Sequence, residues 1–127
     1  MTLAVRVPKT PAGTAVASES ALGATVKVAA SGAKSLLSAG YDNTANAAAS
    51  WLKLYAHASP PLHATDPDLA QKPYYVIKVP ASKHITVTCT SADAEIPTAV
   101  GFGAFTTPGS TGTTSPSTPG RGTVALY

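Results

Sequence analysis

Charged side chains are scarce in this sequence. Asp, Glu, Lys and Arg make up 12% of the 127 residues, with a net charge of +3, whereas soluble domains usually carry about 25%. Disordered chains normally carry more charge, so this composition argues against disorder along the whole chain. The basic residues are also scattered, without the clustered stripe of a nucleic-acid-binding protein. We therefore expect no nucleic-acid partner and a surface much of which meets other protein.

Cysteine and long apolar runs are nearly absent. Cys89 is the single cysteine, so no intrachain disulfide can form, and its alternation with Ile85 and Val87 predicts a small buried hydrophobe. Secretion through an oxidising compartment is not indicated. No stretch approaches the roughly 20 apolar residues of a membrane span, and the first residues lack a signal-peptide pattern. We expect a soluble protein that is intracellular when made, with no membrane partner.

Motifs for catalysis, metals and cofactors are also missing. The histidines are too far apart for the zinc spacing of about two to four residues. Each pair of loop carboxylates supplies too few of the roughly six to eight oxygens that calcium requires. No nucleophile elbow, dinucleotide fingerprint or phosphate loop occurs. We therefore predict a non-enzyme with no catalytic, metal or cofactor-binding residues. The histidines are His57, His63 and His84, and the pairs of loop carboxylates are Asp66 with Asp68 and Asp93 with Glu95.

What the sequence does contain is a series of short segments in which apolar and polar residues alternate. With Gly/Pro-rich loops between them, about seven such segments predict a single all-β domain, an antiparallel β-sandwich of jelly-roll-like form, over residues 25–127. The low-complexity run 107–122 predicts an exposed, mobile hairpin loop. The predicted strands are 25–30, 34–41, 49–58, 74–80, 84–90, 99–106 and 122–127.

Residues 1–24 are predicted to form an extended N-terminal arm. Small residues dominate it, and two prolines interrupt it. Its first residues alternate, with Leu3, Val5 and Val7 on one side. That pattern favours an edge strand, added to this subunit or to a neighbour. The alternative is a frayed terminus.

The segment 49–58 is the strongest predicted strand. Leu52 and Leu54 form an aliphatic face that should belong to the core. The opposite face combines aromatic rings with basic groups, which suits contact with a partly polar partner. Its residues, our candidate interface, are Trp51, Lys53, Tyr55 and His57. The alternative is that Trp51 and Tyr55 face a second sheet as core. In 99–106, Gly101 and Gly103 leave one side bare for a backbone or ring to approach.

Three stretches together resemble a family of small structural proteins of tailed-phage virions. The first is 34–55, where a strand ending in Tyr-Asp-Asn and an Asn/Ala connection lead into Leu-Lys-Leu-Tyr. The second is 58–61 with the strand 75–80, and the third is 100–107 with the final Thr-Val-Ala-Leu-Tyr. The resemblance covers residues 34–127. It implies a compact β-sandwich built into the virion, often on or near the capsid, with no catalytic residues.

These observations and the resemblance lead to one functional hypothesis. The chain is expected to be a capsid decoration or cement protein, located on the virion. Its partner would be the phage major capsid protein, bound on the outer surface across junctions between capsid subunits. It would act as a homo-oligomer, with a trimer favoured by the resemblance. The alternative is a tail, neck or fibre accessory with a glycan-binding or host-binding role.

Overall fold

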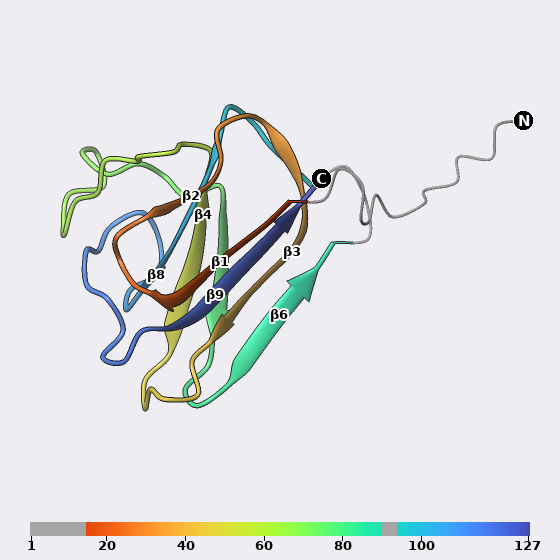
Figure 1. The fold of residues 1–127 in the computed structure, drawn as a ribbon. Helices are drawn as coiled ribbons and strands as arrows, with labels where there is room; N and C mark the ends of the chain where they lie inside the picture. Colours follow the sequence, from red (N-terminus) through yellow and green to blue (C-terminus); the bar gives the residue numbers. More distant parts are fainter. Residues whose placement is uncertain (1–14, 90–93) are drawn as a thin grey trace, which may run out of the picture.

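The computed structural model describes residues 15–89 and 94–127. Within these residues the chain is all-β without any helix, and two antiparallel sheets pack face to face (Figure 1). The predicted β-sandwich is therefore confirmed. Its strands are β1 (Ala15–Leu22), β2 (Lys27–Ala30), β3 (Lys34–Asp42), β4 (Ser50–Tyr55), β5 (Tyr75–Val79), β6 (His84–Thr88), β7 (Glu95–Ile96), β8 (Val100–Phe105) and β9 (Gly120–Leu126).

The strand order is that of a jelly roll. One sheet has the order β1-β9-β3-β6, with the short β7 paired to the start of β3, and the other has the order β2-β8-β4-β5. The antiparallel pairs are nested along the chain: β4 with β5, β3 with β6, β2 with β8 and β1 with β9. Such nesting is one long hairpin rolled into two sheets, the jelly-roll arrangement.

Two strands lie where the sequence predicted none. β1 pairs with β9 along its length, so residues 15–22 belong to the sandwich, and the predicted boundary between arm and domain at residue 24 is wrong. β7 pairs with Lys34 and Ser35 of β3. It lies between the predicted strands 84–90 and 99–106, where the sequence predicted a loop. Residues 1–14, which include Leu3, Val5 and Val7 of the candidate interface, lie outside the described residues.

The main core fills the space between the sheets. Leu52 and Leu54 of β4 and Val124 and Leu126 of β9 are fully buried, as their alternation predicts. The strand β3 departs from strict alternation, because its register to β9 shifts between Leu36 and Ser38. Such a bulge adds one residue to the strand. Leu36 therefore joins the core beside Ala39 and Tyr41, although alternation alone placed it on the opposite face.

Tyr41 ties one end of the β1–β9 pair, where Leu22 and Gly120 are partners, to the core. Its hydroxyl donates to the Leu22 carbonyl (3.0 Å) and accepts from the Gly120 amide (2.9 Å). Burial raises the pKa of this phenol.

We expect Tyr41→Phe to lower the free energy of unfolding by about 1–2 kcal/mol, because both backbone groups lose their partner. Urea unfolding would measure the loss, with Tyr75→Phe, a half-buried tyrosine on β5, as the control. An equal effect of the two substitutions would contradict the role given to Tyr41.

Candidate functional site

The outer face of the four-stranded sheet carries the residues that the sequence proposed as an interface. Lys53 and Tyr55 are fully buried there, whereas Trp51 is half-buried and His57 is exposed. Two loops, 56–74 and 106–119, lie over this face. The expectation of a partner contact is therefore wrong for Lys53 and Tyr55, which the chain itself covers. For Trp51 and His57 it stays a prediction.

A second, smaller core lies under these loops. Tyr55 and Phe105 meet edge to face, with ring centroids 6.4 Å apart, and Ala24, Val26 and Leu62 pack around them. The bare glycine face of β8 makes room for this core. A Cβ atom at Gly103 would lie 3.0 Å from the Phe105 ring, closer than side chains normally pack. The prediction that the glycine face admits a neighbouring ring is confirmed.

Lys53 fastens the loop 106–119 onto the sheet. Its Nζ donates to the Thr111 carbonyl (3.0 Å) and lies 4.5 Å from the centroid of the Phe105 ring. Burial lowers the pKa of this amine to about 8, because desolvation disfavours the charged form. The Tyr55 hydroxyl is buried with no hydrogen-bond partner among the described residues, and burial raises its pKa to about 12. The polar groups of Lys53 and Tyr55 are thus enclosed by the chain itself and are not presented to a partner.

The low-complexity loop 106–119 does not hang free. The Ala24 amide donates to Ser115 Oγ (2.8 Å), and the Thr118 amide donates to Asn46 Oδ1 (2.7 Å). Gly112 and Pro116 are buried. The predicted exposure is confirmed for most of this run. The predicted hairpin is wrong, because β8 and β9, which the run joins, lie in different sheets. The run lacks apolar side chains, but its backbone groups and small residues let it lie flat on the smaller core.

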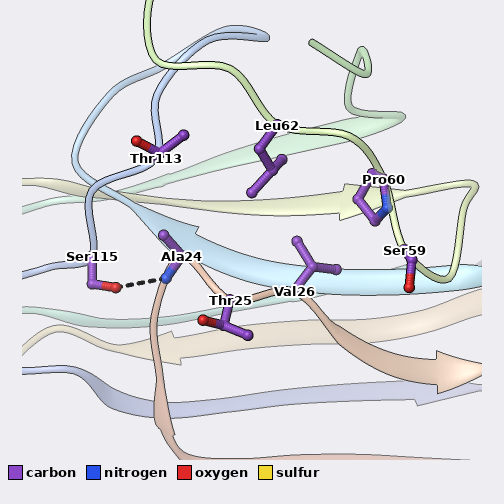
Figure 2. Close-up of a pocket in the computed structure, with 8 residues that line it drawn as sticks. All are labelled: Ala24, Thr25, Val26, Ser59, Pro60, Leu62, Thr113 and Ser115. Atoms are coloured by element: carbon purple, nitrogen blue, oxygen red, sulfur yellow. Dashed lines mark hydrogen bonds between the residues drawn. The ribbon is translucent and has the colours of Figure 1, made fainter.

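A pocket of about 420 Å³ opens where the two loops meet the segment before β2 (Figure 2). Apolar groups form part of its wall, and four hydroxyl side chains stand around them. Charged side chains are absent from the lining. This chemistry suits a neutral ligand that carries hydroxyl or amide groups. The lining residues are Ala24, Thr25, Val26, Ser59, Pro60, Leu62, Thr113 and Ser115.

Part of the outer face of the β1-β9-β3-β6 sheet is made of small residues, and beside this part the Arg121 guanidinium donates to Ser18 Oγ (2.9 Å). Register places two rows across its four strands, pointing away from the core residues Val124 and Ala39. No member of either row is charged. We call these two rows the small-residue face; they are Val16, Ala125, Ser38 and Thr88, and Ser18, Thr123, Gly40 and Thr86. The outward direction of Thr86 and Thr88 was predicted from alternation, but the rows depend on the β1–β9 pairing, which the sequence did not reveal.

The histidines serve as loop acceptors or lie at the surface. The Ser59 amide donates to His57 Nδ1 (3.0 Å), and the Asp66 amide donates to His63 Nδ1 (2.8 Å). Among the described residues, no group of three or more His, Cys, Asp or Glu side chains is placed to hold a metal ion.

The two surfaces and the pocket are the candidate functional features of the molecule. Within 15–89 and 94–127 the chain has no helix of the length and apolarity needed to cross a membrane. In comparisons with known proteins, no family model, curated protein or solved structure matches the chain.

Proposed function

We propose that this chain is a structural protein of a bacteriophage virion, a decoration or cement protein that binds the outer capsid surface across junctions between major capsid protein subunits. Its resemblance over residues 34–127 supports the phage assignment. The jelly roll is common to viral capsid and lectin domains, so the fold alone does not decide between docking and glycan binding. The observation that carries the proposal is the small-residue face.

That face suits docking onto a rigid protein lattice for two physical reasons. Ser, Thr, Ala, Gly and Val have few rotamers to lose when a partner covers them. The side chains of the two rows themselves carry no charge whose hydration would be lost, and the Arg121 guanidinium that donates to Ser18 belongs to an exposed residue beside them. Val16, in one of the rows, is 66% exposed. A partner backbone can then approach closely, and each Å² of apolar area that it buries stabilises the complex by roughly 25 cal/mol. The costs of association are subtracted from this gain. Homo-oligomerisation would let modest contacts act together on the capsid.

The Thr123→Lys substitution tests this proposal. Thr123 lies on the central strand β9 with its side chain on the small-residue face, so a lysine there stays in solvent in the free protein. We expect an unchanged unfolding temperature and at least about a tenfold loss of binding to undecorated phage capsids, because docking would bury an unpaired ammonium. Co-sedimentation with capsids, followed by particle imaging, would measure it.

Two further variants make this test specific. Thr113→Lys, at an exposed loop position over the other sheet, is the matched control and should bind capsids normally. Trp51→Ala tests the face that the sequence favoured. If Trp51→Ala abolishes binding in a folded protein while Thr123→Lys does not, the docking face is assigned wrongly. Failure of the unaltered protein to bind capsids, or its absence from virions, would refute the proposal.

The pocket in Figure 2 favours a second candidate function, a glycan-binding role in a tail, neck or fibre accessory. Its hydroxyl groups both donate and accept hydrogen bonds, as sugar hydroxyls require. Binding of the purified protein to a glycan array, abolished by Thr25→Val and Ser59→Ala together, would favour this role over capsid decoration.

A further inference from the structure

One side of the sandwich is open between its two sheets. β5 ends one sheet and β6 ends the other, and a short turn at 80–83 joins them. Their inward side chains are only partly covered, and Val87 is 39% exposed although it pairs with the buried Ala39. We call this region the open edge. Its apolar residues are Tyr75, Ile77, Ile85, Val87 and Cys89.

Among the five edge strands, which are β1, β2, β5, β6 and the short, Glu95-containing β7, β6 lacks the usual protection against pairing. β1 contains Glu19, β2 contains Lys27 and β5 contains Lys78, whereas β6 reads His-Ile-Thr-Val-Thr. Charged residues and prolines normally keep an edge strand from adding a further strand. Within the described part of the chain, β6 pairs with β3 alone. Its other side therefore has backbone groups available for a partner strand.

The chain itself supplies a segment that fits this edge. Residues 2–7 alternate apolar Leu3, Val5 and Val7 with Thr2, Ala4 and Arg6. A strand with this pattern, paired to β6, would place its three apolar side chains beside Val87 on the inward face. It would thereby cover the open edge with apolar area, while its polar residues face solvent.

Geometry favours the arm of another copy over the chain's own arm. β1 begins at the edge of the sheet opposite β6 and at the Thr88 end of it. For antiparallel pairing with β6, the chain's own arm would cover about 19 Å across the strands and about 17 Å along them. That is a straight path of about 25 Å, whereas the eight Cα–Cα steps from residue 7 to residue 15 span at most about 26–29 Å, which leaves almost no length to go around the sheet. A second copy has no such restriction.

We propose that the open edge of β6 accepts residues 2–7 of a second copy of this chain as an added antiparallel strand. This exchange would make the protein a homo-oligomer through its own terminus. The inference concerns self-association, so it stands or falls separately from capsid binding.

Disulfide trapping tests the pairing directly, because Cys89 at the end of β6 is the only cysteine of the chain. Leu3→Cys, Val5→Cys and Val7→Cys are made singly in the full chain and oxidised mildly. Same-face neighbours of an antiparallel pair come close enough for a disulfide. We expect at least one variant to form a disulfide-linked dimer at least about tenfold faster than Ala4→Cys, whose side chain lies on the opposite face.

The controls identify which cysteines are joined and in which copy. Adding Cys89→Ser should abolish the cross-link, and the unaltered chain should form little dimer through Cys89 alone. A cross-link within one chain would overturn the exchange between copies. Equal rates for Ala4→Cys and all three apolar positions would overturn the strand pairing.

Association of the unmodified chain provides a second readout. Light scattering should show an oligomer, and Val87→Lys should weaken its association at least about tenfold without changing the unfolding temperature of the monomer. Val16→Lys, at an exposed valine on the opposite edge, is the matched control and should leave self-association intact, whatever it does to capsid binding. A chain that stays monomeric up to its solubility limit would overturn the inference.

Discussion

Asn43→Ala is expected to lower the free energy of unfolding by about 4 kcal/mol, because this fully buried carboxamide is the centre of a polar network. Its Nδ2 lies 2.9–3.2 Å from the carbonyls of Ala48, Val79 and Pro80. Its Oδ1 accepts from Ser50 Oγ (2.7 Å) and Asn46 Nδ2 (2.8 Å). Alanine would remove every one of these contacts, and the partner groups of Val79, Ser50 and Asn46 would stay buried.

The network explains why the loss should extend beyond one turn. Through Asn46 it reaches Thr118 of the loop 106–119, with hydrogen bonds of 2.7 and 2.8 Å. Urea unfolding followed by tryptophan fluorescence would measure the loss, and Thr44→Ala, an exposed neighbour, is the control. Asn43→Asp should be about as damaging as Asn43→Ala, since it removes the donor and buries a carboxylate. A loss below about 1 kcal/mol for Asn43→Ala would contradict the network's importance.

The strands with strong alternation could be predicted from the sequence. β4 and β5 are built from Leu, Ile, Val and Tyr, whose shapes suit a pleated sheet with one buried side, and their inward residues agree with the structure. The Asp42–Asn46 turn was also predictable, because Asp and Asn side chains bond the nearby backbone, as Asp42 Oδ1 does by accepting from the Thr44 amide. The burial of Asn43 was not, since three of its five partners come from later segments or the adjoining strand.

The remaining differences arise from non-local contacts. β1 reads Ala-Val-Ala-Ser-Glu-Ser-Ala-Leu, a composition with weak strand preference, and it is a strand because β9, a hundred residues later in the chain, pairs with it. Alternation in β4 separates two faces but does not say what covers the second. Lys53 is covered by the loop 106–119, whose Thr, Ser, Pro and Gly residues hydropathy alone marks as solvent-exposed. Tyr55 belongs to a cluster against which Leu62 of the loop 56–74 packs.

Stability should rise as the pH increases from 8 to 10, because Lys53 is buried as a cation at neutral pH. Its folded pKa is about 8, below the usual unfolded value near 10.4. Between these values the unfolded chain binds more protons than the folded chain, so the free energy of unfolding increases with pH. Above about pH 10 the raised pKa values of Tyr41 and Tyr55 act in the opposite direction. The Lys53 contribution is therefore fully expressed near pH 10 and lost as the pH falls through 8.

Comparison with Lys53→Met isolates this contribution, because all other titrating groups are common to both proteins. The desolvation cost, reduced for screening beneath a single loop, is about 2 kcal/mol. The ring contact and hydrogen bond offset about 1 kcal/mol of it. The Thr111 carbonyl keeps a donor in the variant, since Thr107 Oγ1 lies 2.9 Å away. We therefore expect Lys53→Met to be more stable than the unaltered protein by about 1 kcal/mol at pH 7. We expect this advantage to disappear by pH 10, where the neutral amine no longer has the desolvation cost of a charge but has also lost its cation–π contact.

Urea unfolding of both proteins at pH 7, 8, 9 and 10 would measure how the difference in their free energies of unfolding changes with pH. Lys78→Met, which removes an exposed lysine from the neighbouring strand β5, should give a difference that stays constant over the same range. The comparison also tests the structure of the face that the sequence proposed as an interface. If Lys53 instead extended into solvent to meet a partner, the amine would keep its usual pKa, and both methionine variants would show the same flat difference.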